Sequence, residues 1–480
     1  MFETSFLLCL KHLLANILLP LIPWIFFMWI FYGKKFSWML LYFLSWFVWV
    51  GVLAFSLINL QFIHFWIWVV EYFILLLIII LGFAGKVFIK KEKITDYIKT
   101  LKIKFNWKDI KKSWTVLSTT EKVFSWIILL FVVYFSVVTI ISSLNFPTYA
   151  DDSFWNWNKP AVNIYVDWWI KMVWDNDEIL WRWRLWYPIH IPAYKAMISS
   201  FVWGVNDIYF NMWQELVFLF GLLFIAYISF QKEKDLFKTG LPLGLICWMP
   251  LIYFHSFEGY MELPCVMYCI LSIWAFYQYL EKEDNDYLSL GLLFCFILSY
   301  IKNDWFIVYV PGIVFALLII LLKGKKLKKA IVKFFKDTWN LWKTIFYFVY
   351  FFLPFLIIKL IHWLWFNQAA WDASWLWLAK TIHFEIFSVF KHIFFSLDNY
   401  NVALIPLLLI IYWALRKWDN NKKFLILTWI MVFIILLLVF LLTENYKFVL
   451  DQTTVNRVFT MTFVIIFAFS WIILSNEEDN

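Results

Sequence analysis

Runs of about 20 apolar residues recur along the chain, and this feature constrains its fold more than any other. A run of that length crosses a hydrocarbon core of about 30 Å as a single helix. Inside lipid, the backbone polar groups must be satisfied within the segment, which favours helices over irregular structure. The sequence therefore predicts an all-α integral membrane protein that crosses the membrane many times.

The composition agrees with this class. The chain is 64% hydrophobic and only 15% charged, whereas soluble domains carry about 25% charged residues. The runs predict about thirteen transmembrane helices. Their approximate ranges are 10–32, 36–60, 62–85, 123–144, 209–230, 240–254, 264–280, 287–301, 305–322, 345–366, 401–415, 424–442 and 458–474.

Two lysine-rich interruptions predict the orientation of these helices. Lys86–Lys122 contains eleven lysines, and Lys323–Lys343 contains eight. Short basic loops stay in the cytoplasm, so both loops are predicted there and the amino terminus outside. The net charge of +8 therefore indicates topology and contact with anionic lipid, and predicts no nucleic-acid partner.

The longest polar interruption on the predicted outer face covers residues 145–207. It begins with two adjacent carboxylates, Asp151 and Asp152, only a few residues after an apolar run ends. Paired acids with basic groups behind them suit proton abstraction beside a bound phosphate. The alternative is a solvated loop whose charges only keep it hydrated.

Arginine has an unusual distribution. The chain contains few arginines, and Arg182, Arg184 and Arg457 fall on the predicted outer face, against the positive-inside bias. A planar guanidinium that binds phosphate through two hydrogen bonds is one reason to place arginine there. Anchoring of helix ends, or pairing with an acid such as Asp151, is the alternative.

Separate outward segments are expected to converge if the helices form a bundle. Charged groups at membrane depth are costly and tend to mark a function. This set suits attack of a hydroxyl on a sugar whose leaving group is a lipid-linked phosphate, with Asp151 or Asp152 as base. The predicted substrate-binding residues are Lys159, Arg182, Arg184, His190, Glu258, Glu262, Lys302, Asn303, Asp304 and Arg457.

Four motifs resemble those of bacterial polytopic glycosyltransferases of the GT-C fold, the superfamily of protein mannosyltransferases and lipid A aminoarabinose transferases. They are ADDSFWNWNKPAVNIY, YPIHIPAYKA, EGYMELPCVMY and SYIKNDW, within residues 145–310. The resemblance implies a multi-pass protein of the bacterial plasma membrane, with its active site in outer loops and a polyprenyl-phosphate sugar as donor. It also implies Asp151 or Asp152 as catalytic base, with Lys302 and Arg457 as phosphate contacts. The acceptor is a glycan, a lipid or a protein.

The resemblance also has a departure. In such relatives the acidic pair usually follows the first span, whereas here three additional helices precede it. We therefore expect residues 1–122 to form three amino-terminal helices with a basic cytoplasmic loop. Residues 123–480 would form the catalytic module, with residues 145–207 as its large outer loop.

Two other functions remain open at this level. A transporter or lipid flippase would favour charges near the bilayer midplane, broken helices and an internal repeat. A polysaccharide polymerase or ligase would use outer-loop histidines such as His190, His383 or His392. His190 is also a second candidate base, although a lone histidine between prolines is more often structural. The sequence contains no P-loop, HExxH or glycine-rich nucleotide motif, which argues against a nucleotide-sugar donor.

A divalent metal at Asp151 and Asp152 is a further possibility, because hard cations bind carboxylates. Two adjacent acids without other clustered ligands leave it open, and no other cofactor is expected.

Glycine is scarce and tryptophan abundant. The chain has 12 glycines and 34 tryptophans, whereas average usage predicts roughly 34 glycines. One hypothesis is that the gene uses a code in which UGA specifies glycine, and that translation with another code has placed tryptophan there. The alternative is a tryptophan-rich protein with interfacial belts. UGG codons throughout, at Trp181, Trp183, Trp186 and Trp305, would exclude the first hypothesis.

Overall fold

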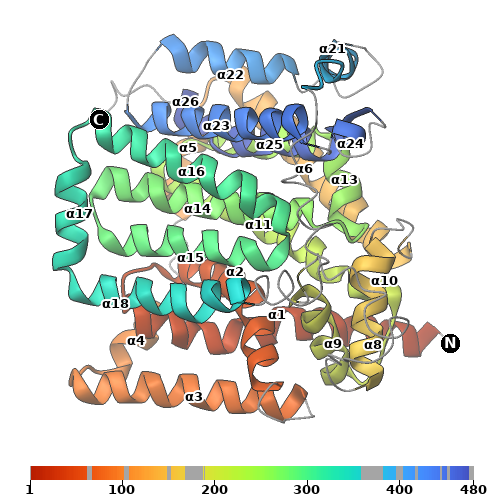
Figure 1. The fold of residues 1–480 in the computed structure, drawn as a ribbon, viewed down its shortest axis with the longest axis vertical. Coiled ribbons are helices and arrows are strands. Elements are labelled where there is room, and N and C mark those ends of the chain that lie inside the picture. Colours follow the sequence, from red (N-terminus) through yellow and green to blue (C-terminus); the bar gives the residue numbers. More distant parts are fainter. Residues whose placement is uncertain are drawn as a thin grey trace. The chain divides into compact units, whose positions relative to one another are not determined.

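A computed structural model describes most of the chain: residues 2–61, 68–101, 107–146, 148, 153–167, 188, 190–357, 382–395, 404–416, 420–443, 446–450 and 455–474. These residues are predominantly helical and form no strand. Figure 1 shows the helices of the chain, which divides into two compact units. Unit 1 comprises Met1–Trp107, Val137–Tyr227 and His255–Met261, and unit 2 comprises Lys108–Ser136, Ile228–Phe254 and Glu262–Asn480.

The structure confirms the all-α membrane class. Among the described residues, eight helices are long and apolar enough to cross a membrane, and a bent pair, Leu236–Cys247 with Leu251–Phe257, makes up to nine. The predicted number of about thirteen and the type of bundle stay predictions. The eight helices are Phe6–Tyr32, Val69–Ile89, Thr119–Asn145, Asp207–Glu233, Glu262–Lys282, Phe306–Lys323, Thr338–Ile357 and Lys422–Leu442.

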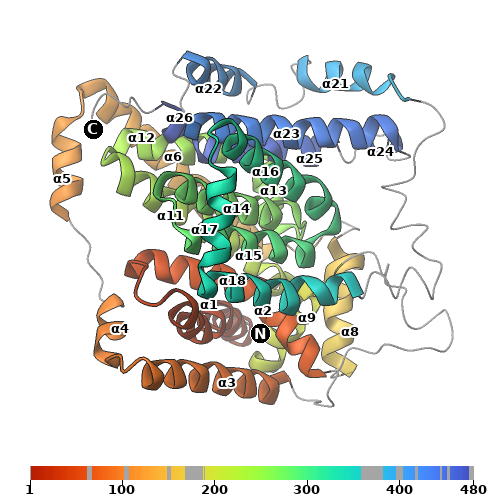
Figure 2. The ribbon, with the colours of Figure 1, turned by 60° about the vertical axis from the view of Figure 1, so that its left-hand side comes forward.

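Unit 1 is built around its first helix. Helix α1 (Phe2–Tyr32) packs against α2 (Trp38–Gln61), α3 (Trp68–Ile89) and α9 (His190–Val202) (Figure 2). Asn16 of α1 is buried, and its polar groups are satisfied within the unit. Its carbonyl accepts from Trp46 Nε1 at 3.0 Å, and its Oδ1 accepts from the Tyr194 hydroxyl at 2.9 Å. Hydrogen bonds of this kind allow a polar residue to sit inside an apolar bundle.

Short helices follow in unit 1 around the acidic pair. The π-helix η1 (Phe154–Asn158) leads into α8 (Lys159–Asp167), which packs against α9. The chain then passes through α10 (Asp207–Phe210) into α11 (Met212–Glu233). Asn206 begins this turn, because its side chain accepts from the Ile208 amide at 2.9 Å and caps α10.

Unit 2 centres on an antiparallel pair, α14 (Glu262–Lys282) and α15 (Asn285–Ile301). Helix α16 (Asn303–Lys323) packs beside α15, and α23 (Asn420–Leu442) packs on α16. In Figure 1, α17 (Leu327–Lys336) runs across the ends of these helices and joins α16 to α18 (Thr338–Tyr347). Helix α14 is enclosed by its neighbours along most of its length.

The remaining helices complete the described part of both units. They are α4 (Ile94–Thr100), α5 (Trp107–Val116), α6 (Thr119–Asn145), α12 (Leu236–Cys247), α13 (Pro250–Phe257), η2 (Phe348–Phe352), α21 (Ile386–Phe395), α22 (Leu404–Arg416), α24 (Tyr446–Leu450), α25 (Val455–Ala468) and α26 (Ser470–Leu474).

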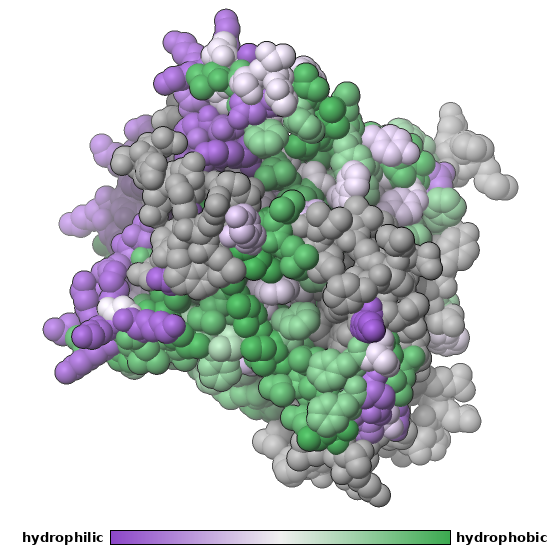
Figure 3. Space-filling view, turned by 90° about the horizontal axis from the view of Figure 1, so that it is seen from above, coloured by the Kyte–Doolittle hydropathy of each residue, from purple (hydrophilic) through white to green (hydrophobic). Residues whose placement is uncertain are grey.

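The surface is largely apolar where helices are long. Helix α6 exposes large apolar side chains on several sides, among them Leu130 and Tyr134. On the face shown in Figure 3, apolar side chains cover much of the middle, and hydrophilic side chains gather at one side. Exposed apolar surface of this extent is what a lipid-facing surface requires.

Helix α9 ends in a motif that normally needs glycine. The Gly204 amide donates to the Ser199 carbonyl at 3.2 Å, which closes a Schellman turn. The residue before Gly204 is Trp203, whose φ is +56° and whose side chain is 77% exposed. A bulky side chain in this left-handed conformation is an outlier, whereas glycine adopts it without strain. Position 203 therefore favours the recoding hypothesis, and Trp46, buried and hydrogen-bonded, fits as tryptophan.

Two glycines in unit 2 allow helices to approach closely. A Cβ at Gly312 of α16 would lie 2.6 Å from Val432 Cγ2 and 3.1 Å from the Val432 backbone nitrogen. A Cβ at Gly291 of α15 would lie 2.5 Å from the Phe276 ring. Small residues at these contacts are typical of helix packing in membranes.

We expect Gly312→Ala to destabilise the protein by about 1–3 kcal/mol, because the added methyl meets backbone that has no room to move. The matched control is Gly85→Ala on α3, where an added Cβ meets nothing within 4 Å. That change should stabilise by roughly 0.5–1 kcal/mol through helix propensity. Thermal unfolding in detergent would compare them, and equal midpoints would contradict the packing assignment.

We expect Trp203→Gly to stabilise the protein by about 1 kcal/mol, because the left-handed strain is removed. Trp46→Gly should instead cost at least about 3–5 kcal/mol, since it empties a buried site. Thermal unfolding of both variants is the measurement. A loss of stability in Trp203→Gly would show that the tryptophan belongs at position 203.

Candidate functional site

The described residues include only part of the predicted site. Asp151, Asp152, Arg182 and Arg184 lie outside them. Asn303 and Asp304 begin α16 and Arg457 lies in α25, but their side chains are also outside the description. The side chains that are described are those of Lys159, His190, Glu258, Glu262 and Lys302.

A largely buried polar cluster in unit 1 includes residues on both sides of the acidic pair in the sequence. It consists of Thr148, Asn158, Lys195, Asp207 and Asn211. Lys195 Nζ donates to Asn158 Oδ1 at 2.6 Å and to Asn211 Oδ1 at 2.9 Å. Both amide groups then donate to Thr148 Oγ1, at 2.7 Å from Asn158 and 2.8 Å from Asn211. The polar cluster is therefore a closed network and not a set of isolated contacts.

Asp207 completes the polar cluster from the start of α10. Its Oδ1 accepts from Asn158 Nδ2 at 2.7 Å, and its Oδ2 accepts from the Thr148 amide at 3.0 Å. Thr148 precedes the acidic pair and Asn158 follows it. The polar cluster therefore fixes the chain on both sides of Asp151 and Asp152.

Lys195 is the charged centre of the polar cluster. Its side chain projects from α9, a helix whose other described residues are mostly apolar, and it is 2% exposed. Burial lowers the pKa of Lys195 to about 7, and the Asp207 carboxylate opposes this shift. A lysine with such a pKa titrates near neutral pH, which is frequent at functional sites.

The segment that carries Glu258 packs against the same polar cluster. Gly259 has φ +87°, and a Cβ there would lie 3.0 Å from Ser153 Cβ and 3.1 Å from Asn211 Oδ1. The Tyr260 carbonyl accepts from Gln214 Nε2 at 2.7 Å. Ser153 directly follows Asp152 in the sequence. Gly259 of the EGYMELPCVMY motif and Ser153 of the ADDSFWNWNKPAVNIY motif are therefore neighbours within unit 1.

The other predicted residues of unit 1 have different environments. Lys159 begins α8, and its Nζ lies 3.8 Å from the centre of the Trp155 ring, a cation–π contact. His190 begins α9 and is buried, and burial lowers its pKa to about 3. A buried neutral imidazole fits a structural role better than that of a second base. Glu258 is buried.

Glu262 and Lys302 form an ion pair in unit 2. Lys302 Nζ lies 2.8 Å from Glu262 Oε1, and the two side chains are 11% and 1% exposed. Glu262 is the first residue of α14, and Lys302 lies between α15 and α16. The antiparallel pairing of α14 with α15 brings these positions to the same end. The helix N-terminus also favours the carboxylate.

The metal question stays open. Among the described residues, no three histidine, cysteine or acidic side chains come together in a way that holds a metal ion. The two carboxylates on which the possibility depends, Asp151 and Asp152, lie outside those residues.

None of the five residues of the polar cluster was predicted from the sequence, although residues near them in the chain, such as Lys159 and His190, were. Lys195 lies within the quoted YPIHIPAYKA motif and Asn158 within the acidic motif, but neither was selected as a site residue. A lysine in an otherwise apolar stretch is the signal that was available. Its two acceptors, Asn158 and Asn211, come from two other segments, so no spacing in the sequence reveals them.

Comparison of the chain with known protein families, with curated proteins and with solved structures finds no match.

Lys195 gives the stability a pH dependence. Its folded-state pKa, about 7, lies below the usual lysine value of 10.5. Between these two pH values the unfolded state binds a proton that the folded state lacks. The contribution of Lys195 to the free energy of unfolding therefore rises with pH across that window. We expect Lys195→Met to remove this rise. Thermal midpoints between pH 7 and pH 10 measure it, and parallel profiles for the two proteins would contradict the assignment.

Proposed function

We propose that the chain is a membrane glycosyltransferase. It would move a sugar from a polyprenyl-phosphate donor to an acceptor hydroxyl at the outer face of the membrane. The observation that supports this most is the buried polar cluster, which holds the chain at Thr148 and Asn158 on either side of the acidic pair. A general base must be held in position relative to its substrate, and fixed flanking residues supply that condition.

The proposed reaction is a displacement at the anomeric carbon. Asp151 or Asp152 takes the proton of the acceptor hydroxyl, and the oxygen forms a bond to the anomeric carbon. The bond from that carbon to the phosphate oxygen breaks, and the polyprenyl phosphate leaves with the electron pair. Lysine or arginine stabilises the charge that develops on the phosphate. The apolar helices would surround the polyprenyl chain.

The Glu262–Lys302 pair supports an outward location for phosphate binding. Glu262 begins α14, and Lys282 and Glu283 stand at the other end of that helix, near Lys326 and Lys329. A helix of 21 residues is about 30 Å long, close to the thickness of the hydrocarbon core. Because the lysine-rich end belongs in the cytoplasm by the positive-inside rule, Lys302 would face outward.

Buried ionisable groups elsewhere in unit 1 give the transporter alternative less support. His12, Glu71 and Glu215 are buried in candidate spans. A transport site is expected near the bilayer midplane, whereas each of these residues lies in about the first third of its span. The spans are Phe6–Tyr32, Val69–Ile89 and Asp207–Glu233, respectively. The polar cluster lies at the start of the last of these spans, which suits chemistry at a membrane surface.

The test is transfer of radiolabelled sugar from a panel of polyprenyl-phosphate donors in membranes that contain the chain. We expect Asp151→Asn or Asp152→Asn to reduce transfer by about 10²–10⁴-fold, the usual contribution of a general base. Asp167→Asn, the same change at the end of α8, is the matched control and should retain transfer.

Protein levels of all variants must be equal for this comparison. No transfer from any donor, or transfer indifferent to both aspartate substitutions, would contradict the proposal. Flux assays would then test the transporter alternative.

A further inference from the structure

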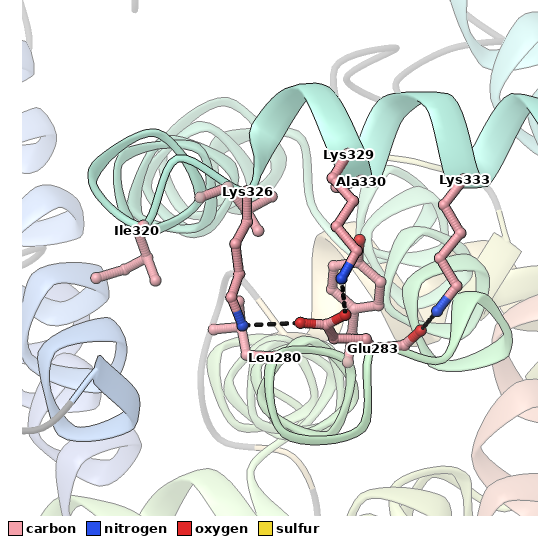
Figure 4. A pocket seen from close by; sticks show the side chains of 10 residues that line it. Leu280, Glu283, Ile320, Lys326, Lys329, Ala330 and Lys333 are labelled. Carbon is pink, nitrogen blue, oxygen red and sulfur yellow. Dashed lines mark hydrogen bonds and ion pairs between the residues drawn. The ribbon is translucent and has the colours of Figure 1, made fainter.

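Helix α17 presents two different faces. Ile331, Val332 and Phe335 are exposed, with Phe335 62% exposed. Residues 326, 329 and 333 follow the helical spacing of three and four and fall on another face. All three of these positions are lysine, and Figure 4 shows their side chains directed toward Glu283. None of the residues of α17 is buried.

The lysines form one wall of a pocket in unit 2. Lys326 Nζ lies 2.7 Å from Glu283 Oε1, and Lys329 Nζ lies 3.1 Å from Oε2. Lys333 Nζ donates to the Glu283 carbonyl. Apolar side chains, among them Leu280 and Ile320, line the rest of the pocket (Figure 4).

The charges of this pocket do not cancel. The Lys326 and Lys329 ammonium groups lower the pKa of Glu283 to about 2, so its carboxylate is ionised at neutral pH. One negative charge therefore faces three positive charges. Glu283 orders the lysines and leaves an excess of positive charge at the mouth of the pocket, which is complementary to an anion.

The position of α17 in the chain restricts where it lies. The helix before it, Phe306–Lys323, and the segment after it, Thr338–Ile357, are both candidate membrane spans. The connections to α17 are only Gly324–Lys326 and Asp337. Because both neighbours enter the membrane, α17 lies at the membrane surface. Its exposed apolar face is then at the depth where interfacial helices bury theirs.

We propose that α17 is an interfacial helix that binds anionic phospholipid headgroups. Ile331, Val332 and Phe335 enter the boundary between headgroups and acyl chains. Lys326, Lys329 and Lys333 bind headgroup phosphates, and the pocket beside Glu283 receives one of them. This inference does not rest on the proposed transferase activity.

The test uses the full chain in lipid nanodiscs and measures amide hydrogen exchange of the segment that contains α17. One set of discs contains phosphatidylcholine alone, and the other contains phosphatidylcholine mixed with phosphatidylglycerol. We expect exchange to be slower in the anionic discs by at least about fivefold, because each lysine near an anionic surface favours binding by about that factor. High salt should remove this difference, since it screens surface charge.

Variants assign the effect to its residues. The triple change Lys326→Gln, Lys329→Gln and Lys333→Gln should abolish the difference between the discs. The matched control removes three lysines from the other basic interruption: Lys90→Gln, Lys91→Gln and Lys93→Gln. It should retain the difference. Phe335→Ser should speed exchange in both kinds of disc, because it weakens insertion of the apolar face.

Three outcomes would overturn the proposal. The first is equal exchange of the unmodified chain in both discs, a result that requires no variant to fold. The second is equal slowing by inorganic phosphate added to phosphatidylcholine discs, which would assign the pocket to a free anion. The third is loss of the difference in the control variant, which would assign it to overall charge.

Discussion

The hydrocarbon core of a membrane cannot hydrogen-bond to a polypeptide, and this constraint shapes both units of the chain. Backbone groups inside hydrocarbon must pair within a helix, so irregular backbone and polar chemistry are confined to places that protein or water covers. In unit 1, the polar cluster of Lys195 lies where short helices and turns replace long spans. In unit 2, the ion pairs of α14 and its neighbours stand at helix ends. These ion pairs join the first residue of α14 to Lys302 and the residue after its last turn to Lys326 and Lys329.

The polar cluster illustrates how a costly group can organise its surroundings. A buried ammonium requires acceptors, and Lys195 obtains them from Asn158 and Asn211, which come from different segments. Each amide then needs an acceptor of its own, which Thr148 supplies and Asp207 supplements. Satisfying one lysine thus fixes four other side chains. A network of this kind is more than the packing of α8 on α9 requires, which is why we associate it with the adjacent acidic pair.

The sequence predicted the class of fold better than the site. Length and hydropathy of the apolar runs identify helices such as α6 and α14, because these properties are local. The contact of Glu262 with Lys302 follows in part from sequence, since both were placed at outer helix ends. The role of Lys302 as a phosphate contact stays a prediction. Lys195 and its acceptors were not identified, because their contacts depend on how α9 packs. Trp203 is a third case. The scarcity of glycine raised the question whether some tryptophan positions encode glycine, and the left-handed backbone at position 203 favours that hypothesis there.

Helix α14 has a further consequence for the membrane around it. Ion pairs tie its first residue to Lys302 and the residue after its last turn to Lys326 and Lys329. A helix held by charges at both ends resists sliding along its axis and tilting between its neighbours. The length of α14 is set by its 21 residues and by the rise of an α-helix, and not by the surrounding lipid. When the bilayer is thinner or thicker than this length, it is the lipid that must stretch or compress to match.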